Sequence, residues 1–144
     1  MAATLAAIIM IAATMLGFIG GDKPETTTLE LGSGTSSAQK YTLEKATSSA
    51  AQVKGLGGRD TLAPSAGMLF EYEDNTQRCI WMKDMRFNID VIWVDATNRV
   101  VSIVPDLKPD SYPQSYCANA LKVIELNAGT ASKHGLRVGQ ILQL

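Results

Sequence analysis

Three charged residues, Lys83, Asp90 and Glu125, lie inside apolar stretches that otherwise resemble buried β-strands. A charge in such a place costs free energy unless it is paired, hydrogen-bonded or solvated. We therefore predict that the three groups approach one another near one end of the fold. Trp81 and Tyr112 are expected to lie beside them, so that the five residues form a candidate ligand-binding site.

This cluster allows three interpretations. Two carboxylates beside a lysine could perform acid–base chemistry, in a small hydrolase or transferase that uses Lys83 with Asp90 or Glu125. If one side is open, the cluster could instead hold a ligand, and the domain would be a binding module. If it is sealed, the charges would form a salt bridge in a structural accessory domain. The sequence favours the binding module over the enzyme, because no nucleophile–base pair and no metal pattern accompanies the carboxylates.

The patterns of several other site types are missing from the sequence. It contains no Cys-x-x-Cys, no His-x-x-x-His, no acidic calcium loop and no Gly-x-Ser-x-Gly, so no metal, cofactor or serine nucleophile is predicted. The single histidine, His134, precedes a glycine in a predicted turn. The formal net charge is −1 and no basic patch stands out, so nucleic acid is not an expected partner.

The distribution of apolar stretches and turn residues predicts a small, mainly β domain. Strands are expected at about residues 41–44, 68–72, 78–82, 89–95, 100–104, 121–126 and 140–144. Thr47 or Ser48 can cap a short helix, and a second helical segment is expected at 130–134. Many short strands with tight turns favour a curled sheet or partly closed β-barrel with one or two short helices.

The N-terminal part of the chain has a different character. Residues 2–21 carry no charge and are long enough to cross a bilayer as a helix. We predict a membrane anchor there; the alternative is a cleaved secretory signal, although the basic n-region of such signals is missing. Residues 22–39 are rich in Thr, Ser and Gly and predict a flexible linker. The β domain is expected over residues 40–144.

The two cysteines, Cys79 and Cys117, form an even pair in a chain with a membrane or secretory segment. We predict a disulfide between them; the alternative is two buried thiols. A disulfide agrees with a domain outside the cytoplasm, because such bonds persist in oxidising compartments. The predicted protein is therefore membrane-tethered and extracytoplasmic, or secreted if the N-terminal segment is cleaved. Its partner would be a small ligand or a protein of the cell envelope.

A series of short motifs follows in an order that resembles a known family. The motifs are Gly-Leu-Gly-Gly-Arg-Asp at 55–60, Gly-Met-Leu-Phe at 67–70, Trp-Met-Lys-Asp-Met at 81–85, Ile-Asp at 89–90, Tyr-Pro at 112–113, Val-Ile-Glu-Leu-Asn-Ala-Gly at 123–129 and Gly-Leu-Arg-Val-Gly-Gln at 135–140. Over about residues 41–144 the chain is similar to the family called domain of unknown function 192. The chain departs from the family pattern at Asp84-Met85, where Asn-Thr is usual, and at Gln140, which replaces an acidic residue. The resemblance implies a compact β-barrel-like domain, often exported or membrane-tethered, and it implies no established activity.

Overall fold

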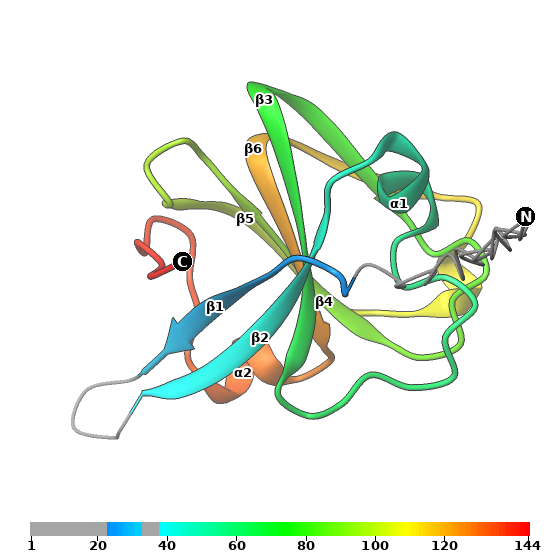
Figure 1. Cartoon of the computed structure of the whole chain (residues 1–144), viewed down its shortest axis with the longest axis horizontal. Coiled ribbons are helices and arrows are strands. Elements are labelled where there is room, and N and C mark those ends of the chain that lie inside the picture. Colours follow the sequence, from blue (N-terminus) through cyan, green and yellow to red (C-terminus); the bar gives the residue numbers. More distant parts are fainter. Residues whose placement is uncertain (1–22, 33–37) are drawn as a thin grey trace, which may run out of the picture.

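The computed structural model describes residues 23–32 and 38–144, which form one six-stranded sheet with short helical segments at its margins. The strands are β1 (Thr26–Leu31), β2 (Gln39–Ala46), β3 (Ala66–Trp81), β4 (Ile89–Val94), β5 (Val100–Leu107) and β6 (Ser115–Asn127). The helical segments are α1 (Ser49–Lys54), the 3-10 turn η1 (Pro109–Ser111) and α2 (Thr130–Lys133). Figure 1 shows how strongly the sheet twists.

The order of strands in the sheet is β1-β2-β3-β6-β4-β5. Strands β2 and β3 are parallel and are connected through α1, whereas every other neighbouring pair is antiparallel. The last strand in the sequence, β6, is therefore inserted between β3 and β4 in the interior of the sheet. Every residue of β4 is buried, as expected for a continuous apolar strand that is covered on both faces.

A separate apolar core lies on each face of the sheet, because successive residues of a strand point to opposite faces. The first core includes Met68, Phe70, Ile80, Val91, Trp93 and Val123. The second core includes Leu29, Leu43, Leu69, Ile92, Ile124 and Leu126. Neighbouring residues such as Val123 and Ile124 of β6 are therefore divided between the two cores.

The prediction of a mainly β domain with one or two short helices is confirmed, but the sheet is not closed into a barrel. The C-terminal segment, predicted as a strand at 140–144, makes two isolated bridges instead. Gln143 pairs with Glu30 of β1, and Ile141 pairs with Arg99 just before β5. The predicted strands 68–72 and 78–82 are one strand, β3, with a register shift against β6 between Glu71 and Thr76.

The linker predicted at 22–39 requires a correction, since β1 lies within it. This strand pairs antiparallel with β2, and its Leu29 and Leu31 are buried in the second core. Alternating leucines supply the apolar face that an edge strand needs, and the β-branched threonines before them also favour a strand. Residues 2–21, on which the predicted anchor or signal falls, lie outside the described residues. Within the described part of the chain, no helix has the length and apolar character needed to cross a membrane.

The predicted disulfide between Cys79 and Cys117 is confirmed. The two residues are directly opposite each other on β3 and β6, with Cα atoms 4.1 Å apart. The bond therefore joins the two longest strands of the sheet.

Candidate functional site

Two segments that are separate in the sequence form one wall of a pocket. The backbone N–H of Gly58 donates a 2.9 Å hydrogen bond to the carbonyl oxygen of Asp84. A Cβ atom at Gly57 would lie only 2.8 Å from the Lys54 carbonyl oxygen and 3.2 Å from that of Lys83. A side chain at position 57 would therefore push the segments apart, which explains the glycine in the 55–60 motif.

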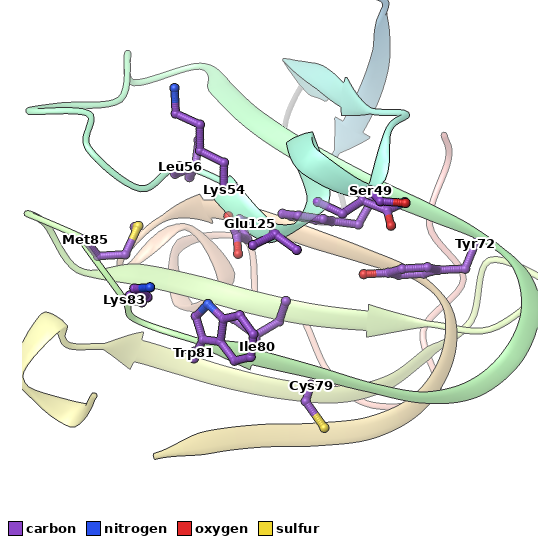
Figure 2. Close-up of a pocket in the computed structure, with 14 residues that line it drawn as sticks. Ser49, Lys54, Leu56, Tyr72, Cys79, Ile80, Trp81, Lys83, Met85 and Glu125 are labelled. Atoms are coloured by element: carbon purple, nitrogen blue, oxygen red, sulfur yellow. The ribbon is translucent and has the colours of Figure 1, made fainter. Parts of the chain in front are cut away.

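The pocket has a volume of about 240 Å³ and lies between α1, the 81–85 segment and strands β3 and β6. We call it the Glu125 pocket, after the carboxyl group near its centre in Figure 2. Apolar and aromatic side chains form most of its wall, and a few polar groups reach it. The lining residues used below are Phe70, Tyr72, Ile80, Trp81, Lys83 and Glu125.

Glu125 has no partner for its buried carboxyl group. The side chain is 4% exposed, and its Oε2 atom forms no hydrogen bond within the described residues. Burial raises the pKa of Glu125 from 4.5 to about 8, against a smaller opposing effect of the Arg59 guanidinium. That guanidinium is itself paired with both carboxylate oxygens of Glu44, at 2.9 Å each. At neutral pH Glu125 is therefore mainly an uncharged acid that can both donate and accept a hydrogen bond.

Lys83 and Trp81 lie at the same pocket from its exposed side. Trp81 is 44% exposed, and Lys83 is also exposed. In Figure 2 both side chains lie on one side of Glu125. No carboxylate of the described residues is within 4.0 Å of the Lys83 ammonium, so Lys83 and Glu125 line one pocket without forming an ion pair.

Tyr72 is a further polar residue of the pocket lining and was missed by the sequence analysis. Its hydroxyl group points toward the middle of the pocket in Figure 2, and the Arg78 guanidinium stacks 4.0 Å from the centre of its ring. Burial raises the pKa of Tyr72, the Arg78 guanidinium opposes this effect, and Glu125 adds a smaller upward effect. The signal was available, because strand alternation places Tyr72 on the same face as Phe70.

Asp90 does not join this site, so its predicted approach to Lys83 and Glu125 is wrong. In the pairing of β4 with β6, Asp90 is opposite Leu126 whereas Val91 is opposite Glu125. Directly opposed residues share a face and successive residues alternate, so the two carboxyl groups point to opposite faces of the sheet. The Asp90 carboxylate instead accepts backbone N–H bonds from Ala131 (2.7 Å), Asp106 (2.9 Å) and Gly129 (3.2 Å).

Tyr112 also lies elsewhere. It follows η1, precedes the cis-proline Pro113 and is 48% exposed, and it does not line the Glu125 pocket. The structure therefore brings together Trp81, Lys83 and Glu125 of the five predicted site residues. Within the described residues, no group of three or more His, Cys, Asp or Glu side chains is arranged to hold a metal ion.

The three segments around the pocket come from the motifs at 55–60, 81–85 and 123–129, and a family model spans all of them. The model for domain of unknown function 192 (DUF192), described as an uncharacterized ACR, matches residues 30–144. The chain belongs to the DUF192 family. No curated protein matches it in sequence.

Two crystal structures share the fold of this DUF192 domain. One is a proposed transcription regulator from Sinorhizobium meliloti 1021, with 24% sequence identity and a TM-score of 0.77; the match covers 86% of this chain and 97% of that one. The other is a protein of unknown function from Novosphingobium aromaticivorans DSM 12444, with 27% identity and a TM-score of 0.76; it covers 87% and 89% of the two chains. These likenesses support the fold and leave the function to be argued from the site.

Proposed function

We propose that this DUF192 domain is a binding module whose Glu125 pocket takes a small organic molecule. One observation carries the proposal: a fully buried carboxyl group, without a hydrogen-bond partner for Oε2, faces a hollow of about 240 Å³. Buried polar groups are normally satisfied, and one that is not costs about 1–3 kcal/mol. A molecule that hydrogen-bonds Glu125 would remove this cost, and its binding would be stabilised accordingly.

The wall of the pocket suggests the kind of molecule. Phe70, Ile80 and Trp81 offer an apolar and aromatic surface, whereas Glu125 and the Tyr72 hydroxyl offer two polar contacts. Ligand pockets commonly combine a mainly apolar wall with a few placed polar groups. The pocket volume is small, so we expect the inner part of the ligand to be about the size of one ring.

Acid–base catalysis by Glu125 is the second candidate. It is favoured by the pKa of about 8, which places the group in the range where a general acid works near neutral pH. In that hydrolase or transferase Lys83 would be the second polar group, and Asp90 would take no part because it lies on the other face. This candidate would be favoured if the protein converts a bound compound and Glu125→Gln abolishes the conversion while the compound still binds.

We further propose that the domain is tethered to a membrane on its extracytoplasmic side. The uncharged segment at 2–21 and the Cys79–Cys117 disulfide support this location. In fractionated cells the full chain should sediment with membranes, and added protease should digest its β domain in intact spheroplasts. Recovery of the full chain in the cytoplasmic fraction with both thiols reduced would reject the location.

The binding proposal can be tested with a matched set of one-ring probes, namely benzamide, benzoate and benzylamine. We expect benzamide to shift the NMR signals of the Glu125 amide and the Trp81 indole in the full chain. Glu125→Leu should weaken benzamide binding about ten-fold, as expected for the loss of one buried hydrogen bond. Glu73→Leu, at an exposed acidic position on β3, is the control and should bind as the wild type does.

The opposite result is equally specific. If none of the three probes shifts pocket signals, the Glu125 pocket is not a small-molecule site. If benzamide binds Glu125→Leu as well as the wild type, the unpaired carboxyl group is not what holds it. Either result would reject the proposal.

A further inference from the structure

A second, wider hollow adjoins the Glu125 pocket. It has a volume of about 960 Å³ and lies between α1, Gly57, Gly58 and the Lys83–Arg86 segment. We call it the outer hollow. Lys83 and Met85 line both spaces, as do the neighbouring residues of α1, so the two spaces meet along this line. A ligand that enters the Glu125 pocket can therefore extend into the outer hollow.

The outer hollow is positively charged. Its lining contains the cations Lys54, Lys83 and Arg86 and the single carboxylate Asp84. Arg86 is paired with Asp60, whereas Lys54 and Lys83 have no ion-pair partner within 4.0 Å in the described part of the chain. The whole chain has a formal net charge of −1, so this local excess of positive charge does not follow from composition.

The two lysines differ in position relative to Glu125. Figure 2 shows Lys83 beside Trp81 at the pocket, whereas the Lys54 side chain extends away from Glu125. Lys83 is therefore placed to contact a molecule that fills the Glu125 pocket, whereas Lys54 also lines this pocket but directs its ammonium group away from Glu125. This gives the site an order from outside to inside: a cation at Lys83, an apolar wall at Ile80, and an uncharged acid at Glu125.

We propose that the ligand is a small organic anion whose acid group docks on Lys83 and whose uncharged body enters the Glu125 pocket. The proposal rests on the binding function proposed above and adds the charge and orientation of the ligand. The acid group is a carboxylate or a phosphate, because both offer the anionic oxygens that an ammonium group binds.

A cationic ligand fits the same geometry poorly. Its charge would have to pass the unpaired ammonium of Lys83 and then pair with Glu125. Burial raises the pKa of Glu125 to about 8, so near neutral pH the group offers little negative charge. An amine would therefore have to ionise a buried acid in order to bind, whereas an anion meets an unpaired cation at the entrance.

Titration of the full chain with benzoate, phenyl phosphate, benzamide and benzylamine tests the inference, because the four probes share one ring and differ in charge. We expect benzoate or phenyl phosphate to bind about five-fold more tightly than benzamide, and benzylamine to bind most weakly. The preference for the anion should decrease in about 0.5 M NaCl, since this entrance is exposed to solvent.

Lys83→Met and Lys54→Met form a matched pair of variants. Lys83→Met should abolish the advantage of benzoate and of phenyl phosphate over benzamide while leaving benzamide binding within about two-fold. Lys54→Met should change either anion by no more than about two-fold, because its ammonium group extends away from the pocket.

The outcomes separate this inference from the proposal beneath it. If benzamide binds at the pocket but neither anion binds more tightly, or if Lys83→Met preserves the advantage, the anion inference is overturned while the binding function stands. If no probe reaches the pocket, both fail. Tighter binding of either anion that is lost in Lys83→Met supports the inference, and the tighter of the two probes identifies the acid group.

Discussion

Asp90 and Glu125 are two buried carboxyl groups on adjacent strands, and they have opposite surroundings. Asp90 is fully buried and accepts hydrogen bonds from three backbone N–H groups. Glu125 is 4% exposed, and its Oε2 atom has no partner in the described residues. In the sequence both are single acids within apolar strands. The comparison teaches that burial alone does not distinguish the two carboxyl groups, whereas their hydrogen-bond partners do.

The two groups also act on different parts of the molecule. Asp90 connects β4 to the residues at the end of β5 and at the start of α2, so it holds the fold together. The Glu125 carboxyl group lines a hollow next to the 55–60 and 81–85 segments, and its Oε2 atom bonds no other element among the described residues. Removing Asp90 should therefore cost stability, whereas replacing Glu125 should increase it.

The largest effect is expected for Asp90→Ala. The substitution leaves the N–H groups of Asp106, Gly129 and Ala131 without their acceptor, and a hydrogen bond to a charged group contributes about 1.5–3 kcal/mol. We expect a loss of about 5 kcal/mol in the free energy of unfolding, measured by urea denaturation. Asp90→Asn keeps one acceptor oxygen and should lose clearly less. Equal stability of Asp90→Ala and the wild type would remove the structural half of the comparison.

The disulfide beside the pocket should come next. Replacing Cys79 and Cys117 with alanine opens a loop that spans a sequence separation of 38 residues. In the chain-entropy model this lowers the free energy of unfolding by about 4 kcal/mol. The loss should be the same in the wild-type and Glu125→Gln backgrounds, because the crosslink acts on the unfolded chain; a double-mutant cycle in urea measures this. A coupling above about 1 kcal/mol would show that the bond shapes the Glu125 pocket itself.

Glu125→Gln should stabilise the protein, and increasingly so as pH rises. The pKa of Glu125 is about 8 when folded and 4.5 in its ordinary environment, so the folded state binds more protons between these values. The contribution of the wild-type acid to the free energy of unfolding is fully present below about pH 4.5 and is lost as pH rises to about 8. The amide side chain of the variant does not titrate. The free energy of unfolding of Glu125→Gln should therefore exceed that of the wild type by about 3 kcal/mol at pH 7.

The measurement is the difference in unfolding free energy between wild type and Glu125→Gln at pH 5, 6, 7 and 8. Glu73→Gln provides the control at an exposed position and should show a small difference without this trend. A constant difference for Glu125→Gln across the series would contradict an uncharged Glu125 in the folded state.

The smallest effect is expected for Lys83→Met. The side chain is exposed and has no ion pair in the described residues, so the free energy of unfolding should change by less than about 0.5 kcal/mol. Combined with Asp90→Leu, its effect should be additive, because the two residues do not contact each other. Thermal unfolding of both single variants and the double variant tests this, and rescue of Asp90→Leu by Lys83→Met would bring back the predicted three-residue cluster.

Local patterns in the sequence were sufficient for several elements. Alternating and apolar stretches predicted most of the strands, because the side-chain period of a strand is two and does not depend on partners. A helix cap at Thr47 or Ser48 was predicted for the same local reason, and in the structure the Ser48 hydroxyl oxygen accepts a hydrogen bond from the Ala51 N–H. The edge strand β1 was missed because the Thr, Ser and Gly content of residues 22–39 was interpreted as a linker, although Leu29 and Leu31 alternate within it.

The sequence by itself indicated that charged groups within apolar strands are costly unless they are paired, hydrogen-bonded or solvated, and that Cys79 and Cys117 form an even pair. It did not determine which groups meet, because the register between β4 and β6 decides whether the side chains of Asp90 and Glu125 point to the same face of the sheet. A shift of one residue would exchange the two faces. Only the tertiary structure placed β6 between β3 and β4, gave Asp90 three backbone donors and left Glu125 facing a hollow beside Lys83. The physical reason is that hydrogen bonding and burial at these positions come from strands far apart in the chain, and no local pattern encodes their pairing.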